Sequence, residues 1–407
     1  MTTAQATLEA SGDNRAFGPG RGLRHPDPRK APDRLTRPGG KAPYLHQIDL
    51  FRLITFACVI LIHVVGATNF PQDVGANAVE TPLHFTREAF FALTGFVLVF
   101  QNRGRELAPG DFWRRRLPLV ATPYLAWSMF FWAFSLVTGT QQPDSLEASM
   151  RLLLKDLLTG GAWYHLYFLL VTMQVYLLFP WIMKLLRATE GKHKWLLSGS
   201  AVLQVGVTLF MTYQPFGVSY ETITHLYATV LPYQFYTLFG AVVAMHFEAV
   251  HAWVGRHRLL LGGLLVAVLA GTEWIYLHTV HSGTFPQVAS DPFQPYLIPW
   301  CVTVIAAVYA FATWWSGRRR EGSRGARLVS WAANRSFSIF LVHPLALAML
   351  GPVIPVVAEH FGAPWLSVVI YLATIVATIL IVEALRRLPG SRALTGRPRL
   401  RPAKATA

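Results

Sequence analysis

The stretch "DLFRLITFACVILIHVVGATNF", residues 49–70, is apolar over almost its whole length. An apolar run of about twenty residues can cross the hydrocarbon layer of a membrane as a helix. The run nevertheless contains Arg52 and His63, and ionisable side chains at this depth are costly and commonly functional. Its hydropathy therefore predicts a membrane helix, and its two ionisable residues are the first candidates for a functional site.

The composition of the whole chain is also typical of a membrane protein. The 407 residues are 53% hydrophobic and 14% charged, with a mean hydropathy of +0.37, whereas soluble proteins carry roughly 25% charged residues. Cys58 and Cys301 both lie in apolar runs. The sequence therefore predicts neither a disulfide framework nor a thiol motif.

Ten apolar segments predict an all-α integral membrane bundle over residues 44–388. The segments lie at 48–68, 83–101, 117–138, 162–186, 195–213, 228–248, 258–279, 296–316, 329–349 and 366–386. Residues 1–43 and 389–407 are basic and rich in Pro, Gly and Arg, which predicts disordered tails. The first tail does not have the pattern of a secretory signal peptide.

Basic residues are distributed unequally between the two sides of this topology. Thirty of the 36 Lys and Arg residues lie in the tails and in the loops on the same side, and only Arg87, Arg151 and Lys155 lie in the opposite loops. Because cytoplasmic loops carry the excess of Lys and Arg, both termini are expected in the cytoplasm of a cell with the protein in its plasma (inner) membrane. This topology explains the net charge of +15, so nucleic acid is not an expected partner.

Arg52 and His63 share one face of the first helix. Eleven residues at 100° each leave them only 20° apart in azimuth and roughly 16 Å apart along the axis. A snorkelling arginine and a histidine with an ordinary interhelical hydrogen bond would explain each residue alone. Together they indicate a polar path through the bundle.

Two further histidines are predicted at a depth similar to that of His63. Counted from the cytoplasmic surface, His63 lies at about 20 Å, His343 at about 18 Å and His165 at about 24 Å. The sequence therefore predicts a histidine layer in the outer half of the membrane. No local spacing such as His-x3-His occurs, and no metal site is expected.

The cytoplasmic surface has the opposite chemistry, because arginines are concentrated there. They are Arg52, Arg114, Arg115, Arg116 and Arg335. Lipid headgroups and topology account for any one of them. As a group they are suited to bind a phosphorylated donor, since guanidinium binds phosphate through a fork of donors that stays charged.

Five motifs, in order, resemble those of acyltransferase family 3, the bacterial ten-helix membrane acyltransferases. The first is Arg52, ten intervening residues and His63. The others are "FFALTGFVL" (90–98, with Thr94 where serine is usual), "FWRRRLPLVATPYLAWS" (112–128), "WYHLYFLLVTMQVYLLFP" (163–180) and "SFSIFLVHPLAL" (336–347). The resemblance spans roughly residues 45–388. One departure is Leu119, where many members carry a further basic residue; either Arg114 replaces it or donor binding differs.

The resemblance implies transfer of an acyl group, most often acetyl from cytoplasmic acetyl-CoA, to a hydroxyl of a carbohydrate, glycan or glycoside, such as O-acetylation of a cell-envelope polysaccharide. His63 would act as general base or carry the acyl group briefly, and Arg52 would orient the donor. Arg114, Arg115, Arg116 and Arg335 would bind the acyl-CoA phosphates. His165, His343 and Thr94 would bind the acceptor or relay protons. A transporter or exporter of a glycan or small solute is the alternative that the polar path leaves open.

Overall fold

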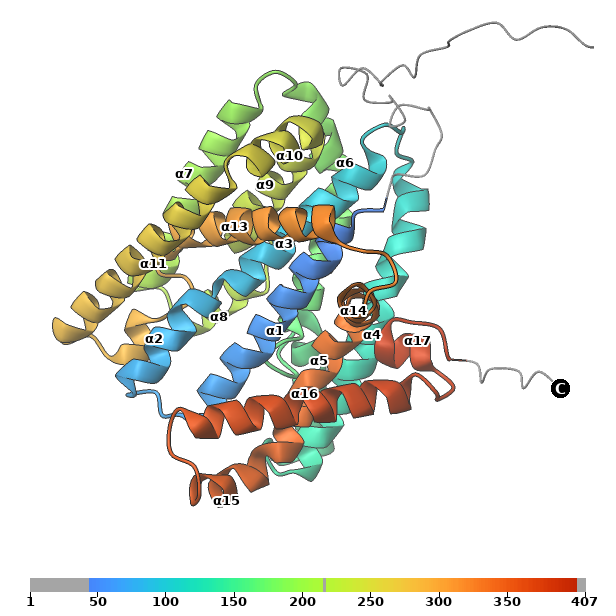
Figure 1. The fold of residues 1–407 in the computed structure, drawn as a ribbon. Coiled ribbons are helices and arrows are strands. Elements are labelled where there is room, and N and C mark those ends of the chain that lie inside the picture. Colours follow the sequence, from blue (N-terminus) through green and yellow to red (C-terminus); the bar gives the residue numbers. More distant parts are fainter. Residues whose placement is uncertain (1–43, 215–216, 401–407) are drawn as a thin grey trace, which may run out of the picture. The chain divides into compact units, whose positions relative to one another are not determined.

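All regular secondary structure in residues 44–214 and 217–400, which the computed structural model describes, is helical (Figure 1). A helix satisfies its backbone hydrogen bonds internally, which is the requirement that hydrocarbon imposes on a spanning segment. The predicted all-α fold class is confirmed for these residues. The predicted tail at 1–43 lies outside the described residues.

Nine helical stretches in the described part are long and apolar enough to cross a membrane. They are α1 (His46–Thr68), α2 (Val74–Leu83) with α3 (Phe85–Asn102), α4 (Pro109–Val137), α6 (Tyr167–Ala188), α7 (His193–Tyr213), α11 (Arg258–His281), α13 (Leu297–Arg318), α14 (Arg324–Leu350) with α15 (Ile354–Ala358), and α16 (Trp365–Leu385). Each coincides with one of the ten predicted segments.

The remaining predicted segment, 228–248, is broken rather than continuous. It contains η2 (Leu231–Tyr233) and α9 (Gln234–Met245), after which α10 (Phe247–Arg256) continues at an angle of 94°. His246 lies at the bend, where its Nε2 is 2.8 Å from Nδ1 of His193. The described residues therefore contain nine candidate spans, or ten if the bent pair is one span.

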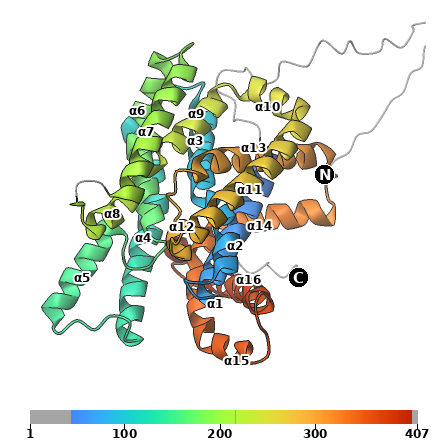
Figure 2. The same ribbon diagram turned by 90° about the vertical axis from the view of Figure 1, so that its left-hand side faces the viewer.

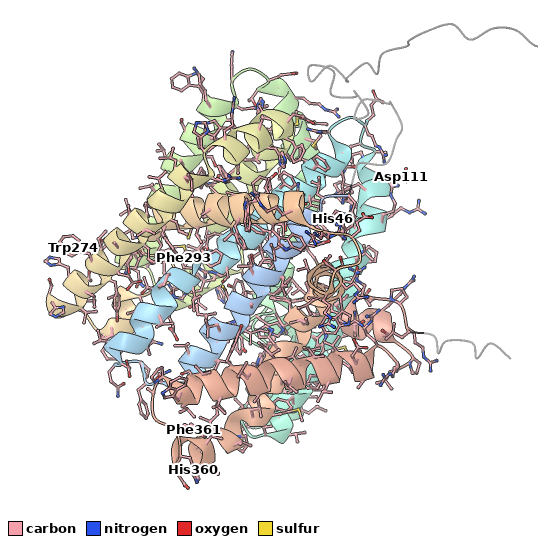
Figure 3. The ribbon with its side chains drawn as sticks, viewed as in Figure 1. His46, Asp111, Trp274, Phe293, His360 and Phe361 are labelled. Atoms are coloured by element: carbon pink, nitrogen blue, oxygen red, sulfur yellow. The ribbon has the colours of Figure 1, made fainter. Side chains whose placement is uncertain are left out.

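The two ends of the bundle have different residues and are named accordingly. The arginine end contains the starts of α1, α4, α7 and α14, and the histidine end contains the end of α1 and the connecting helices α5 (Leu146–Thr159), α8 (Tyr220–Tyr227) and α12 (Pro286–Ala289). Figure 3 shows His46 and Asp111 at the arginine end and His360 and Phe361 at the opposite end. Figure 2 shows α5, α6, α7 and α8 on one side of the bundle and α1, α2, α11 and α16 on the other.

The span made by α2 and α3 is the most enclosed. Its apolar window is 72% buried, against 17–44% for the other spans. Glycines bring α3 and α9 into direct backbone contact: a Cβ on Gly95 would lie 2.0 Å from the carbonyl oxygen of Thr237, and one on Gly240 would lie 1.8 Å from that of Ala92. Small residues at such crossings let membrane helices approach closely.

The predicted disorder of residues 389–407 is wrong for the short helix α17 (Ser391–Thr395). The indole N–H of Trp127 donates to the carbonyl of Leu394 (2.9 Å), and the Ser338 hydroxyl donates to that of Thr395 (2.7 Å). These hydrogen bonds come from α4 and α14, which are distant in sequence, and hold a segment whose own composition favours disorder. Residues 401–407 lie outside the described part of the chain.

We expect Gly240→Ala to destabilise the protein, because the added methyl group would overlap the carbonyl oxygen of Ala92. Overpacking of this kind costs about 1–3 kcal/mol. The measurement is the thermal midpoint of the detergent-solubilised protein, followed by size-exclusion chromatography after heating.

Gly199→Ala in α7 is the matched control, because no atom lies within 4 Å of a Cβ at that position. It should leave the midpoint unchanged or raise it slightly, since Ala favours helix over Gly. Equal midpoints for Gly240→Ala and Gly199→Ala would contradict the close crossing of α3 and α9.

Candidate active site

A cavity of about 480 Å³ lies at the histidine end, and we call it the histidine cavity. It is formed by α1, α2, α3, α6, α14 and the segment that precedes α6. Its polar lining consists of His63, Glu80, His84, Thr86, Arg87, Tyr164, His165 and Tyr167. Aromatic rings, including Phe90 and Phe168, complete the wall. A few polar groups within an apolar wall is the usual design of a small-molecule site.

The three histidines of the predicted layer are brought together here. The ring centroid of His343 lies 5.4 Å from that of His63 and 5.9 Å from that of His165. His63 and His165 line the cavity, whereas His343 is buried behind them. Tyr164 packs on His63 at 4.5 Å between centroids. The sequence predicted that the three histidines lie at a common depth, and the tertiary structure shows that their side chains also point toward one another.

The hydrogen bonds of these rings identify which nitrogens remain available. Nδ1 of His343 is 2.8 Å from the carbonyl oxygen of Phe340, so this nitrogen carries the proton of a neutral ring and Nε2 has the lone pair. Both nitrogens of His165 are buried without a hydrogen-bond partner. His165 precedes α6, and burial lowers its pKa well below its ordinary range. It is therefore neutral at physiological pH, and its ring offers one hydrogen-bond donor and one acceptor.

A glycine turn places Tyr164 and His165 at the cavity. Gly160 ends α5 with a left-handed φ of +73°, a conformation that favours glycine. A Cβ there would lie 2.4 Å from Cα of Tyr167. The turn therefore packs directly on the start of α6 and directs the chain back across the cavity.

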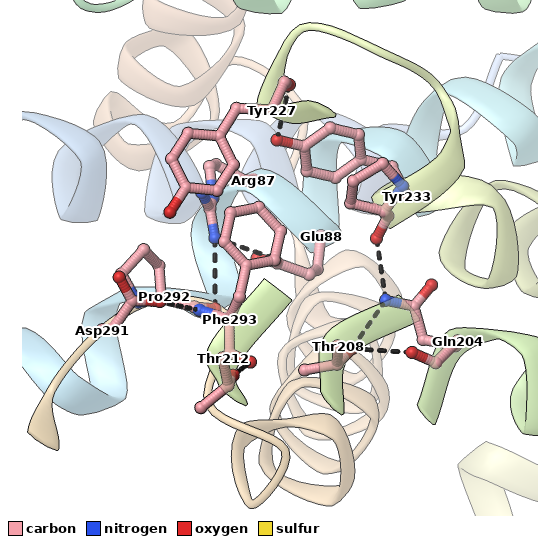
Figure 4. Close-up of polar contacts among 11 residues, drawn as sticks. Arg87, Glu88, Gln204, Thr208, Thr212, Tyr227, Tyr233, Asp291, Pro292 and Phe293 are labelled. Atoms are coloured by element: carbon pink, nitrogen blue, oxygen red, sulfur yellow. Dashed lines mark hydrogen bonds and ion pairs between the residues drawn. The ribbon is translucent and has the colours of Figure 1, made fainter. Parts of the chain in front are cut away.

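Arg87 is the cationic group of the histidine cavity (Figure 4). Its Nη2 donates to Glu88 Oε1 and to the carbonyl oxygen of Pro292, both at 3.2 Å. Its guanidinium lies over the ring of Phe293, 4.4 Å from the centroid. Arg87 is therefore a paired charge that its contacts hold in place in the first turn of α3.

A second cavity, of about 370 Å³, contains Arg52 at the arginine end and is called the arginine cavity. Its other polar lining residues are Tyr44, Asp49, Gln101 and Arg105. The Tyr44 hydroxyl donates to Asp49 Oδ2 at 2.7 Å, and burial together with this hydrogen bond raises the pKa of Tyr44 to about 12. The cavity thus combines two guanidinium groups with neutral and acidic hydrogen-bonding groups.

The other predicted arginines are not equivalent. Arg116 donates to Oε1 of Gln101 at 2.5 Å and so adjoins the arginine cavity. Arg114 and Arg115 are exposed, and Arg115 bonds to the carbonyl of Asp111 on its own helix. Arg335 lies outside the lining of this cavity, where it is paired with Glu383 and covers the ring of Trp331 at 4.3 Å.

The region between the two cavities is aromatic. Phe56 lies on α1 between Arg52 and His63, and its ring packs 4.5 Å from that of Phe90. Thr94, one turn after Phe90 on α3, donates its hydroxyl to the Phe90 carbonyl at 2.8 Å. Thr94 lies outside the lining of both cavities. Its predicted role in acceptor binding or proton relay therefore stays a prediction that no contact with either cavity supports.

Sequence reasoning overlooked several lining residues because their positions looked like membrane boundaries. Glu80 lies in a helix, α2, that the apolar pattern did not predict, and His84 and Arg87 lie at the start of the predicted segment 83–101. Arg105, which topology alone explains in the sequence, lines the arginine cavity. One available signal was Arg87 itself, a basic residue on the side of the bundle where basic residues are few.

The described residues contain no group of three or more His, Cys, Asp or Glu side chains placed to hold a metal ion. The histidine rings face one another at more than 5 Å between centroids and share their surroundings with aromatic rings. What the arrangement offers chemically is a set of imidazole rings beside the paired Arg87 and the carboxyl group of Glu80.

We expect Arg335→Gln to lower stability, because it leaves Glu383 partly buried without its cation. A buried hydrogen-bonding group left without its partner costs about 1–3 kcal/mol. The thermal midpoint should fall, and the double variant Arg335→Gln/Glu383→Gln should recover part of the loss. No recovery in the double variant would show that the pair does not stabilise the fold and would restore Arg335 as a candidate for donor binding.

Comparison with known proteins places these features in a family. The model of the acyltransferase 3 family, described as an acyltransferase domain, matches residues 45–383, which is most of the chain and includes Arg52 and His63. No curated protein and no solved structure matches the chain. The resemblance seen in the five motifs is confirmed. The chain belongs to the acyltransferase 3 family, and it is a multi-pass membrane acyltransferase.

Proposed function

We propose that the protein transfers an acyl group, in particular acetyl, from cytoplasmic acyl-CoA to a hydroxyl of a carbohydrate, glycan or glycoside. The observation that carries the proposal is the histidine cavity, in which His63 and His165 face one space with the ring of His343 directly behind them. Neutral imidazole is suited to take a proton from a hydroxyl near neutral pH. Among the described residues, none hydrogen-bonds to the ring of His63.

The arginine cavity is the proposed seat of the donor. Arg52 and Arg105 line it, and Arg116 adjoins it through Gln101. These groups suit the phosphates of acyl-CoA because guanidinium binds phosphate bidentately. The acyl-pantetheine arm would then follow the face of α1 from Arg52 toward His63, a distance of roughly 16 Å along the helix. Arg114 and Arg115 are exposed outside the arginine cavity and would contact only the part of the donor that extends from it.

The proposed chemistry is acyl transfer assisted by a general base. The acceptor oxygen attacks the thioester carbonyl carbon while His63 takes the hydroxyl proton. The new carbon–oxygen bond forms, the carbon–sulfur bond breaks, and the CoA thiolate leaves and is protonated. In a two-step variant His63 itself is acylated first and then passes the group to the acceptor. His165 and His343 would bind the acceptor or relay the proton.

The charge distribution supports an orientation in the plasma membrane with both termini in the cytoplasm. The arginine end would then face the cytoplasm, where acyl-CoA is present. The histidine end would face outward, toward an envelope glycan or a secreted glycoside.

We expect His63→Ala to reduce acyl transfer by about 10²–10⁴-fold, the usual contribution of a general base. Cells carrying wild type or His63→Ala at matched membrane expression are compared by mass spectrometry of O-acetyl groups on envelope glycans and secreted glycosides. His360→Ala is a matched control, because that ring is exposed in the loop before α16.

The same comparison separates the enzyme from an exporter. If O-acetylation is equal in wild type and His63→Ala cells while the amount of exported glycan differs, the role of His63 as a base is wrong and transport replaces acyl transfer.

We expect Arg52→Ala to raise KM for acyl-CoA more than it changes KM for the acceptor, since Arg52 lines the arginine cavity. Arg52→Lys should retain only part of the affinity, because ammonium lacks the planar fork. The measurement is initial rates in membrane vesicles over a range of each substrate. A larger effect on acceptor KM than on donor KM would contradict the placement of the donor.

A further inference from the structure

A third hollow, of about 530 Å³, adjoins the histidine cavity and has no part in the mechanism above. It lies between α5, the segment that follows it, and α8, and we call it the α5–α8 hollow. Its lining includes Asp156, Trp163, Tyr164, Tyr167, His225 and Tyr227. Tyr164 and Tyr167 also line the histidine cavity. The two spaces therefore share a wall of two tyrosines, one of which, Tyr164, packs on His63.

A second connection between the two spaces runs through Phe293 (Figure 4). Arg87, which lines the histidine cavity, lies over this ring at 4.4 Å, and Tyr227, which lines the hollow, stacks on it with centroids 4.7 Å apart and planes 11° apart. The Tyr227 carbonyl accepts a hydrogen bond from the Tyr233 hydroxyl at 3.1 Å. The side of the hollow nearest the active site is thus a rigid aromatic stack.

The hollow also contains a buried acceptor and a buried donor without hydrogen-bond partners. Asp156 is 5% exposed and its Oδ2 has no partner, and Nε1 of Trp163 has none either. Burial raises the pKa of Asp156, which lies in α5 outside the spanning helices. Buried polar atoms without partners are rare in proteins and call for an explanation, which a bound ligand can supply.

The fold does not need either polar atom. The turn after α5 uses the Asp156 backbone carbonyl, which accepts from the N–H groups of Gly160 and Gly161, and not its carboxylate. The ring of Trp163 is held by stacking on Phe131 at 4.7 Å between centroids, and its N–H takes no part in that contact. A carboxylate, an indole N–H and several aromatic faces together match a sugar ring, whose hydroxyls both donate and accept and whose C–H faces stack on aromatic rings.

We propose that the α5–α8 hollow is a second sugar-binding subsite, so that the acceptor has at least two adjoining sugar residues. One residue presents its hydroxyl to His63 in the histidine cavity, and the next occupies the hollow across Tyr164 and Tyr167. Asp156 accepts a hydrogen bond from a hydroxyl of the second residue and Trp163 donates one to it. The volumes of both spaces fall in the range of about 300–1,000 Å³ found for small-molecule sites. This inference rests on the proposed function, because it extends the same acceptor site.

The test compares mono- and disaccharide binding to the full-length protein in detergent, without acyl-CoA, so that no turnover occurs. The probes are methyl β-glucoside with methyl β-cellobioside and N-acetylglucosamine with chitobiose, titrated by ligand-observed NMR. For at least one pair the disaccharide should bind about tenfold more tightly than the monosaccharide. Asp156→Asn and Trp163→Phe, which keep side-chain shape, should each reduce that ratio severalfold, whereas the exposed Asp144→Asn should not.

Two results would overturn the inference. One is that, in the wild-type protein, every disaccharide binds no more tightly than its monosaccharide, or that no sugar of the panel binds. The other is a ratio that Asp156→Asn and Trp163→Phe leave unchanged, with both variants folded by size-exclusion chromatography.

An acyl-CoA transfer assay on the same sugars separates this inference from the proposed function. Transfer to a monosaccharide without a disaccharide preference would overturn the second subsite alone. A disaccharide preference in binding without transfer to any sugar would overturn the proposed function and leave a two-residue sugar site.

Discussion

An ionisable side chain at the centre of a membrane helix costs about 3 kcal/mol unless the bundle shields it, and much of this structure follows from that cost. His63 and Arg52 lie on one face of α1, so one packing arrangement turns both away from lipid. α1 accordingly packs on α3, α13, α14 and α16. The two spaces that receive these side chains are the two polar cavities of this helix face.

The position of these cavities depends on close backbone packing. Gly95 and Gly240 let α3 and α9 touch, which sets the depth of α3 and therefore of Arg87 at its start. At the other side of the histidine cavity, Gly160 packs on Tyr167 and turns the chain toward the site. These glycines thus position the polar side chains of the cavities, although they have no functional side chain themselves.

The exceptions to the charge rule have structural meaning. Three basic residues, one in α3 and two in α5, lie on the side of the bundle that is otherwise poor in them. Arg87 lines the histidine cavity and Lys155 lines the α5–α8 hollow, whereas Arg151 pairs with Glu147 one turn away on α5 at 2.8 Å. Two of the three basic residues therefore stand at polar spaces. That signal is visible in the sequence.

Hydropathy and helical periodicity were sufficient for the helical bundle, for most of its spans and for the shared face of Arg52 and His63, because these depend on local spacing along one chain. The five motifs were sufficient for the family. Only the tertiary structure brought His165 and His343 to His63, paired Arg335 with Glu383, broke the sixth segment at His246 and held α17 on α4 and α14. Azimuth and pairing are set by contacts between segments far apart in sequence, and no single helix contains that information.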